Sequence, residues 1–262
     1  MTAEPAAMSG GTTKARLARP LAVFNAGPFA RMKDGFFDAC GGDNDVLFAR
    51  TLGFDMADIR AIDLEAGDPL PKAGDVAGVV ISGSVAMITE RRDWAERTAR
   101  WIADNAAKVP ILGVCFGHQL VAHALGGRVD WCAKGSEYGT RPIVLTDEGA
   151  ADPLFAGTPA RFKAQAAHSQ GVKELPGGAL LLAHNDHSVQ AVRYAAMAWG
   201  TQFHPEFDKP LMEVLFRDYR DELGRIGVDV PAAAAALEET SSAMSVLGNF
   251  AAIVRSGAAV VA

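Results

Sequence analysis

The sequence has 262 residues, and because 49% of them are hydrophobic, a core of ordinary size can form within one domain. The formal net charge of -6 provides no basic stripe of the kind that nucleic-acid binding through phosphate contacts requires. The three cysteines, Cys40, Cys115 and Cys132, are too few and too widely spaced for a disulfide framework or a zinc site. We therefore expect small-molecule chemistry in a reducing, cytoplasmic setting, without a metal, cofactor or nucleic-acid partner.

The start of the chain is rich in Ala, Thr and Gly and lacks the continuous apolar core of a secretory signal. No apolar run approaches the roughly 20 residues that cross a bilayer, so no membrane partner is expected. We predict that residues 1–19 form a flexible tail and residues 20–228 one α/β domain. Residues 229–262 are predicted to be an Ala-rich extension that is helical in part.

Short apolar runs alternate with helical patterns in the first half of the chain. Strands are expected at residues 20–25, 58–64, 76–81 and 110–114, and helices at residues 45–52, 91–107 and 117–125. Residues 35–42 are expected to be a loop, because glycine occurs at both ends. The apolar, β-branched run at residues 76–81 is typical of a parallel sheet that is covered on both faces.

The second half of the chain begins with short strand patterns separated by Gly, Pro and Asp. They lie at residues 141–145, 161–164, 180–183 and 197–202. A closing helix is expected at residues 208–225, and a weak helical pattern follows at residues 244–254. Alternating strands and helices followed by clustered strands predict a doubly wound, mostly parallel α/β sheet with flanking helices and a small antiparallel extension.

Cys115 lies between Gly113 and Gly117, where an apolar strand is expected to meet a helix. A sharp turn of this kind holds its central residue in strained dihedral angles, and flanking glycines avoid collisions with neighbouring backbone. The helix N-terminus favours a thiolate, and the N–H of Phe116 is a natural donor to an oxyanion. On its own, the pattern fits an ordinary buried cysteine equally well.

A candidate base and its partner follow a late strand, where His204 and Glu206 are separated by Pro205. A thiolate nucleophile needs an imidazole for proton transfer and a carboxylate that orients the imidazole. Taken alone, His204 could be a structural histidine and Glu206 a surface charge.

Five other histidines are rival bases: His118, His123, His168, His184 and His187. His118 and His123 lie on the helix after the nucleophile and are poorly placed to face it, so His168 is the more credible rival. Trp94 and Trp101 are interpreted as helix-packing core, and Cys40 and Cys132 as inert thiols.

The segment Gly-Val-Cys-Phe-Gly-His-Gln at residues 113–119, with the downstream His-Pro-Glu, resembles the class I, triad-type glutamine amidotransferases. The similarity covers residues 21–219. A loop at residues 82–84 and a following Trp-containing helix resemble stand-alone GMP-synthase-like members and plant-type γ-glutamyl peptidases. The resemblance implies a flavodoxin-like amidotransferase domain at residues 20–228.

The resemblance implies that Cys115 attacks the glutamine side-chain amide, His204 is the general base and then acid, and Glu206 orients His204. It also implies an oxyanion hole and substrate contacts. The oxyanion residues would be Phe116, Gly83 and Ser84, with Ser84 favoured as the donor and Gly83 supplying the turn. The substrate contacts would come from Gln119 and the backbone of Ser169 and Gln170.

Relatives differ at some of these positions. Many carry Gly-Gly-Pro or Asn-Gly-Pro where this chain has Ser82-Gly83-Ser84, and some carry Asn at the position of Ala167. Gln119 could instead be a helix-surface amide. Glu137 lies where relatives have a loop near the site, and it could support the substrate pocket or lie in a surface turn.

The fate of the amine is left open by the sequence. No Gly-x-x-x-x-Gly-Lys-Ser/Thr loop is present, so ATP-dependent amination would need a separate synthetase subunit. The chain could also work unaided as a γ-glutamyl peptidase or hydrolase. A non-catalytic binding or regulatory module would be expected to lack a triad residue. The chaperone and deglycase superfamily shares the cysteine turn but would not be expected to carry His-Pro-Glu.

Overall fold

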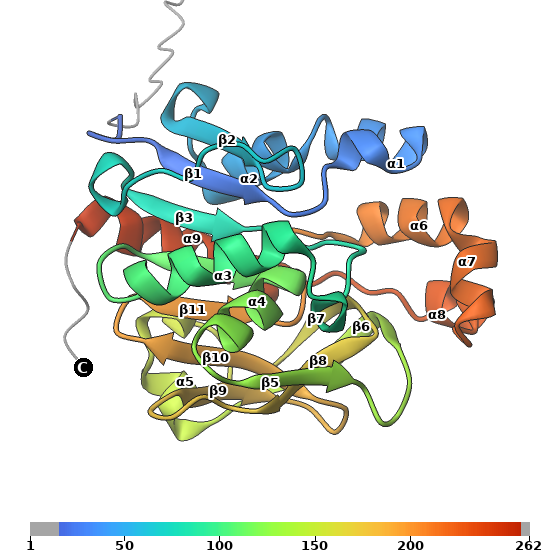
Figure 1. Cartoon of the computed structure of the whole chain (residues 1–262). Helices are drawn as coiled ribbons and strands as arrows, with labels where there is room; N and C mark the ends of the chain where they lie inside the picture. The colour runs from blue at the N-terminus through green and yellow to red at the C-terminus, as the bar shows by residue number, and fades with distance from the viewer. Residues whose placement is uncertain (1–15, 258–262) are drawn as a thin grey trace, which may run out of the picture.

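A computed structural model describes residues 16–257 of the chain (Figure 1). Most of the tail expected at residues 1–19, and the last five residues of the expected extension, lie outside this described part. Within it, a nine-stranded sheet has the order β2-β1-β3-β4-β11-β10-β9-β6-β7, and β5 pairs separately with β8. The strands are β1 (Leu21–Asn25), β2 (Ile59–Asp63), β3 (Gly78–Ile81), β4 (Ile111–Val114), β5 (Arg128–Trp131), β6 (Glu137–Leu145), β7 (Arg161–His168), β8 (Gln170–Glu174), β9 (Leu180–His184), β10 (Val189–Ala195) and β11 (Ala198–Thr201).

The sheet has a parallel half and an antiparallel half. β2, β1, β3, β4 and β11 run parallel to one another. β10, β9, β6 and β7 continue the sheet in antiparallel pairs. The predicted fold class, a doubly wound and mostly parallel sheet with flanking helices and an antiparallel extension, is confirmed. The carboxyl ends of β3, β4 and β11 meet at one edge, where sites in such sheets assemble.

Helices cover both faces of the parallel half (Figure 1). In β1, Leu21 and Val23 belong to one apolar cluster, with residues of α2 and α9, whereas Ala22 and Phe24 belong to another, with residues of α3 and α4. This alternation is expected of a strand buried on both faces. The helices are α1 (Asp34–Cys40), α2 (Asn44–Leu52), α3 (Asp93–Asn105), α4 (Phe116–Ala124), α5 (Asp147–Ala151), α6 (Lys209–Asp218), α7 (Arg220–Arg225), α8 (Val230–Ala235) and α9 (Ser241–Ser256).

A third apolar cluster lies beyond the carboxyl edge of the sheet, where Figure 1 shows α1, α6, α7 and α8 gathered together. The prediction of a loop at residues 35–42 is wrong, because residues 35–40 belong to α1. Phe36 and Cys40 are fully buried in the cluster. Packing of these side chains against α6 and Phe207 thus stabilises a helix that local propensity did not indicate.

The prediction of a single closing helix at residues 208–225 is also wrong. The backbone of Tyr219 departs from helical geometry and separates α6 from α7. Its hydroxyl accepts a hydrogen bond from the Lys33 backbone N–H at 2.8 Å and so ties α6 and α7 to the start of α1. Farther along, α8 and α9 fall within residues 229–262, and α9 packs onto the sheet. No helix among the described residues is long and apolar enough to cross a membrane.

Candidate active site

The turn between β4 and α4 places Cys115 at φ 52° and ψ -103°. Among the described residues, Arg91 is the other non-glycine residue with a positive φ. A Cβ atom on Gly113 would lie 2.4 Å from the carbonyl group of Gly117, and one on Gly117 would lie 2.2 Å from the Ile81 carbonyl oxygen. Close backbone approach therefore excludes side chains on both sides of this strained cysteine.

The candidate base follows β11, the strand that pairs in parallel with β4. The Cys115 N–H donates to the Thr201 carbonyl at 2.8 Å, and the His204 N–H donates to the Gln165 carbonyl at the same distance. These backbone bonds fix both segments at the carboxyl edge. The imidazole Nδ1 of His204 lies 2.7 Å from Oε1 of Glu206, and both side chains are almost fully buried.

Three segments converge at Cys115. A Cβ atom on Gly83, in the loop after β3, would lie 3.0 Å from His204 Cε1 and 3.7 Å from Cys115 Cβ. The Cys115 thiol contacts the Ala167 carbonyl oxygen at 3.6 Å, and the amide nitrogen of Gln202 donates toward its sulfur at 3.6 Å. The thiol is therefore enclosed by the ends of several strands.

The pKa of His204 is raised to about 10. Burial alone lowers this pKa, but the negative charges of Glu206 and of the Cys115 thiolate, together with hydrogen bonds to both, outweigh burial. The Phe207 ring stacks on the imidazole with a centroid separation of 4.1 Å and an interplanar angle of 8°. The ring is thus held in one plane and carries a proton readily.

A cavity of about 460 Å³ opens over this arrangement. All the residues that the sequence singled out for the site line it: Gly83, Ser84, Cys115, Phe116, Gln119, Ser169, Gln170, His204 and Glu206. They come from the loop after β3, the β4–α4 turn, the β7–β8 turn and the segment after β11. Among the described residues, no group of His, Cys, Asp and Glu could hold a metal ion.

Comparison with known proteins decides the family. The family model "Glutamine amidotransferase class-I" matches residues 50–220. The chain belongs to this family. It is 37% identical over 141 residues to a glutamine-hydrolysing GMP synthase subunit of Methanopyrus kandleri, covering 53% of this chain and 71% of that protein. It is 32% identical over 143 residues to "Gamma-glutamyl peptidase 5" of Arabidopsis thaliana, covering 53% of this chain and 56% of that protein.

A solved structure shows the same fold. The crystal structure of a glutamine amidotransferase from Thermotoga maritima superimposes with a TM-score of 0.69 at 21% identity, and the match covers 90% of this chain and 97% of that one. The matched share of this chain extends well beyond residues 50–220, so the resemblance in fold includes segments that the family model leaves out.

In this amidotransferase, Gln119 is not a helix-surface amide. It is 4% exposed, and its amide nitrogen donates to the Gln170 carbonyl at 2.8 Å and to Oε1 of Gln202 at 3.0 Å. An amide nitrogen has two hydrogens, so both are used within the protein and only the carbonyl oxygen of Gln119 is left for a ligand. Gln170 likewise has a buried side-chain oxygen without a partner.

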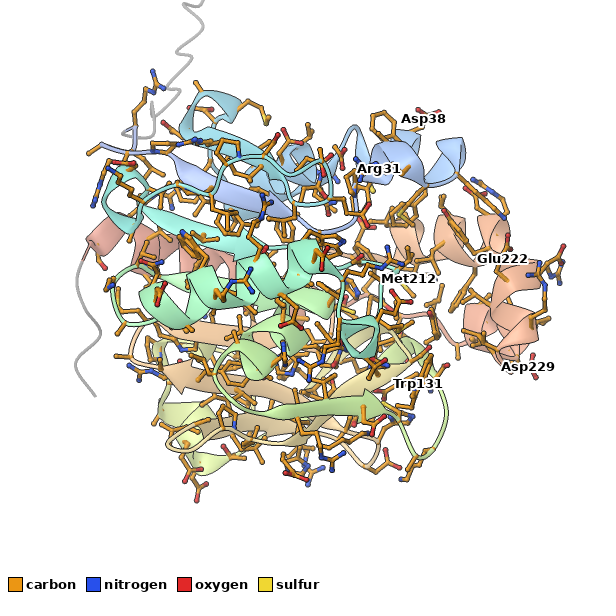
Figure 2. All side chains as sticks on the ribbon, in the orientation of Figure 1. Arg31, Asp38, Trp131, Met212, Glu222 and Asp229 are labelled. Carbon is orange, nitrogen blue, oxygen red and sulfur yellow. The ribbon has the colours of Figure 1, made fainter. Side chains whose placement is uncertain are left out.

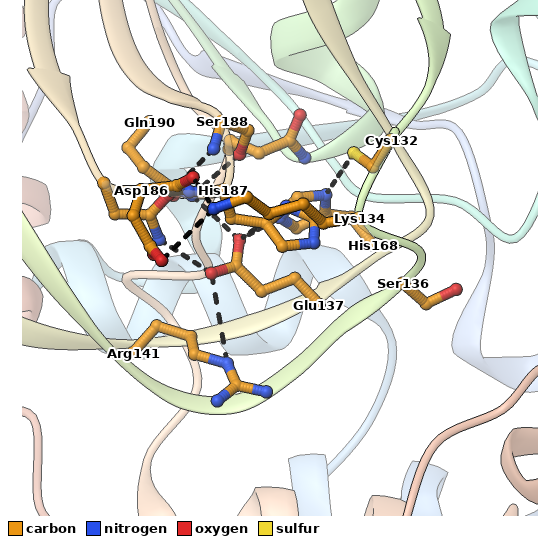
Figure 3. Close-up of polar contacts among 12 residues, drawn as sticks. Cys132, Lys134, Ser136, Glu137, Arg141, His168, Asp186, His187, Ser188 and Gln190 are labelled. Atoms are coloured by element: carbon orange, nitrogen blue, oxygen red, sulfur yellow. Dashed lines mark hydrogen bonds and ion pairs between the residues drawn. The ribbon is translucent and has the colours of Figure 1, made fainter.

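The rival base His168 lies in a buried network centred on Glu137 (Figure 3). Its Nδ1 contacts the Gln170 carbonyl at 3.0 Å and its Nε2 contacts Glu137 at 2.9 Å. Glu137 also accepts hydrogen bonds from Asn185 and Gln190. Burial alone raises the pKa of Glu137, but His168 outweighs it and the pKa is lowered. A surface turn is therefore the wrong interpretation of Glu137, and both ring nitrogens of His168 are engaged away from Cys115.

The other two rivals on α4 are occupied elsewhere. His118 is fully buried beside Gly200 and 3.0 Å from the Tyr194 hydroxyl, and burial lowers its pKa to about 3. His123 contacts Glu96 and Arg91.

The sequence did not single out three residues that lie near Cys115 or His204: Tyr138, Gln202 and Phe207. Burial and the nearby charge of Cys115 raise the pKa of Tyr138 to about 12, although a hydrogen bond with Ser169 acts to lower this pKa. Phe207 immediately follows Glu206, so its position beside that motif was the available signal, whereas the contact of Gln202 with the thiol depends on the fold.

Proposed function

We propose that this chain hydrolyses the side-chain amide of glutamine, or of a related γ-glutamyl compound, with Cys115 as nucleophile. His204 acts as general base and then acid, and Glu206 orients its ring. The observation that carries the proposal is a strained cysteine beside a buried His–Glu pair, with all three side chains on one cavity. Retention of all three residues disfavours a non-catalytic binding or regulatory module.

The proposed chemistry has two half-reactions. The Cys115 sulfur attacks the γ-carbonyl carbon, and the carbonyl oxygen becomes an oxyanion. The C–N bond then breaks as the His204 imidazolium donates a proton to the departing nitrogen, which leaves ammonia and a γ-glutamyl thioester. Water, losing a proton to His204, attacks the thioester carbon. The C–S bond breaks, glutamate is released and the thiolate is restored.

The oxyanion hole is proposed to consist of the backbone N–H groups of Phe116 and Ser84, with Gly83 providing the turn. Phe116 is the first residue of α4, and the N-terminal N–H groups of a helix favour negative charge. The absence of a side chain at Gly83 keeps the space beside His204 and Cys115 open.

The glutamyl half of the substrate is proposed to lie beside Gln119, Ser169 and Gln170. The amide nitrogen of Gln119 is engaged within the protein, so its amide oxygen remains as an acceptor that suits the α-ammonium group of a glutamyl compound. The Ser169 backbone would complete these contacts.

Two fates of the amine are proposed. The similarity to a protein named as one subunit of a GMP synthase supports delivery of ammonia to a separate synthetase subunit. The similarity to a γ-glutamyl peptidase supports unaided hydrolysis of γ-glutamyl amides. Three cysteines without disulfide bonds support a cytoplasmic location.

The decisive test measures ammonia release from glutamine by the purified chain. We expect Cys115→Ser to lower kcat by about 10³-fold or more, because removal of a nucleophile disables the whole triad. Cys132→Ser, at another buried cysteine, serves as the matched control and should keep activity. Wild-type turnover in Cys115→Ser, with a correctly folded protein, would disprove the assignment.

A further inference from the structure

The cavity over Cys115 continues well beyond the catalytic residues, and this continuation is apolar. Its wall is made by side chains from the segment around α1, the loop after β3, the end of β5, β6 and the α6–α7 pair. These residues are Phe29, Met32, Phe36, Val85, Met87, Trp131, Tyr138, Leu215, Tyr219, Leu223 and Ile226. Figure 2 labels three residues of the cavity lining, Arg31, Glu222 and Trp131, on different sides of the space between α1, α7 and β5.

Several of these apolar side chains are exposed. Six large apolar residues are exposed among the described residues, and three of them line the cavity: Val85 (77%), Trp131 (57%) and Ile226 (49%). They come from three different segments of the chain, so their convergence does not follow from the amphipathic pattern of any one helix. Exposed apolar side chains that gather at one concave site mark a surface that binds an apolar group.

The position of His204 determines which part of the substrate meets this wall. In the proposed reaction, the departing nitrogen receives its proton from His204, so the amine lies on the side of the imidazole. Phe207 stacks on that imidazole, and Phe36 packs edge-on against Phe207 with centroids 5.7 Å apart. The polar groups proposed to bind the glutamyl half, by contrast, belong to Gln119 and to the backbone of Ser169 and Gln170.

The charges on the lining disfavour an acidic amine. Arg31 is paired with Asp63 at 2.8 Å and with Glu65 at 2.7 Å. Glu65 and Glu222 also line the cavity. Glu65 is also paired with Arg92 at 3.2 Å, and Glu222 with Lys33 at 2.8 Å. A carboxylate on the amine would therefore meet charges that are already paired and would gain little from Arg31.

We propose that the natural substrates are γ-glutamyl amides whose amine carries an uncharged aromatic or branched alkyl group. This inference rests on the proposed function and extends it from the acyl half to the amine half. A cavity of about 460 Å³ falls in the range of roughly 300–1,000 Å³ that accommodates drug-sized ligands, which are larger than glutamine. The bonds made and broken are those of glutamine hydrolysis, with a primary amine leaving in place of ammonia.

The test compares three substrates of the purified chain: L-glutamine, γ-glutamylglycine and γ-glutamylbenzylamide. We expect kcat/KM for the benzylamide to exceed that for each of the others by about 10-fold or more, because apolar groups of this size are discriminated to that extent by an apolar pocket. The activity must also be lost in Cys115→Ser.

A pair of variants tests the wall itself. Ile226→Asp should lower the ratio of kcat/KM for the benzylamide to that for glutamine by about 10-fold. Leu180→Asp replaces an apolar residue of similar exposure, 44%, that does not line the cavity, and should leave the ratio unchanged.

The outcomes separate the two proposals. Hydrolysis of glutamine at an equal or higher kcat/KM than the benzylamide overturns the inference and leaves the proposed function standing. If Ile226→Asp leaves the ratio of kcat/KM for the benzylamide to that for glutamine unchanged, the proposed position of the amine against the apolar wall is wrong. If none of the three substrates is hydrolysed in a Cys115-dependent way, the proposed function fails and the inference fails with it.

Discussion

The contact between His204 and Glu206 has the clearest electrostatic consequence of any single pair in the site. A buried imidazolium without a partner would lose its proton easily, because burial penalises the charged form. Here the carboxylate at 2.7 Å and the Cys115 thiolate reverse this effect and raise the pKa of His204 to about 10. Proton donation to the departing amine should therefore persist far above the ordinary imidazole pKa of about 6.5.

Replacing the carboxylate should change the pH profile in a defined direction. Glu206→Gln removes a charge that stabilises the imidazolium, so the pKa of His204 falls and the alkaline limb of kcat/KM moves to lower pH. We also expect kcat to fall by about 10²-fold or more, as when the orienting carboxylate of a triad is lost. The profile would be measured with glutamine as substrate.

Glu137→Gln is the matched control, because Glu137 is also a buried carboxylate bound to a histidine, His168. The alkaline limb of the pH profile of kcat/KM for Glu137→Gln should lie at the same pH as that of the wild-type protein. A limb that is unmoved in Glu206→Gln, or equally moved in both variants, would contradict the role given to Glu206.

At the scale of elements, the β4–α4 turn depends on glycine. Although alanine is the better helix former, the Cβ of Gly117→Ala would lie 2.2 Å from the Ile81 carbonyl oxygen, which belongs to the backbone of β3. We expect this substitution to lower the free energy of unfolding by about 1–3 kcal/mol or more. Denaturation by urea provides the measurement.

Gly248, in the middle of α9, offers the opposite case. A Cβ there would meet nothing within 4 Å, so Gly248→Ala should raise the free energy of unfolding by about 0.5–1 kcal/mol. An increase in the free energy of unfolding in both variants would show that helix propensity, and not backbone approach, governs the turn.

The sequence predicted those elements whose signal is local. Apolar runs marked β1, β2, β3 and β4, and glycine spacing marked the turn at Cys115. It did not predict β8 or β10, because Gln170, Gln190 and Arg193 are polar residues that become buried through contacts with distant segments. The helix α1 was missed for the same physical reason, since its stability comes from packing against α6 and Phe207 and not from propensity.

The candidate site shows the same division. Cys115, His204 and Glu206 were found because short motifs carry them, and their roles stay proposals. Gln202, which reaches the thiol, and the buried state of Gln119 could not be found, because each depends on a partner many residues away.

At the scale of the whole molecule, α9 contributes to the core although it lies outside the family match at residues 50–220. Phe250 on this helix is fully buried in the cluster shared with β1, β3 and β4. Phe250→Ala should lower the free energy of unfolding by about 3–5 kcal/mol, measured by urea denaturation. Met244→Ala, on the exposed side of the same helix, should change it by no more than about 0.5 kcal/mol. Similar small effects in both would contradict a structural role for α9.

The pairing of β4 with β11 brings together segments made at different times during synthesis. Cys115 and its neighbour Gln202 are 87 residues apart, and His204 follows later still. A chain that grows from its N-terminus presents the thiol long before the segment with the proposed base has been translated. An unfinished copy that stops before β11 would therefore carry Cys115 without a base, so the proposed activity would begin only after most of the chain has been made.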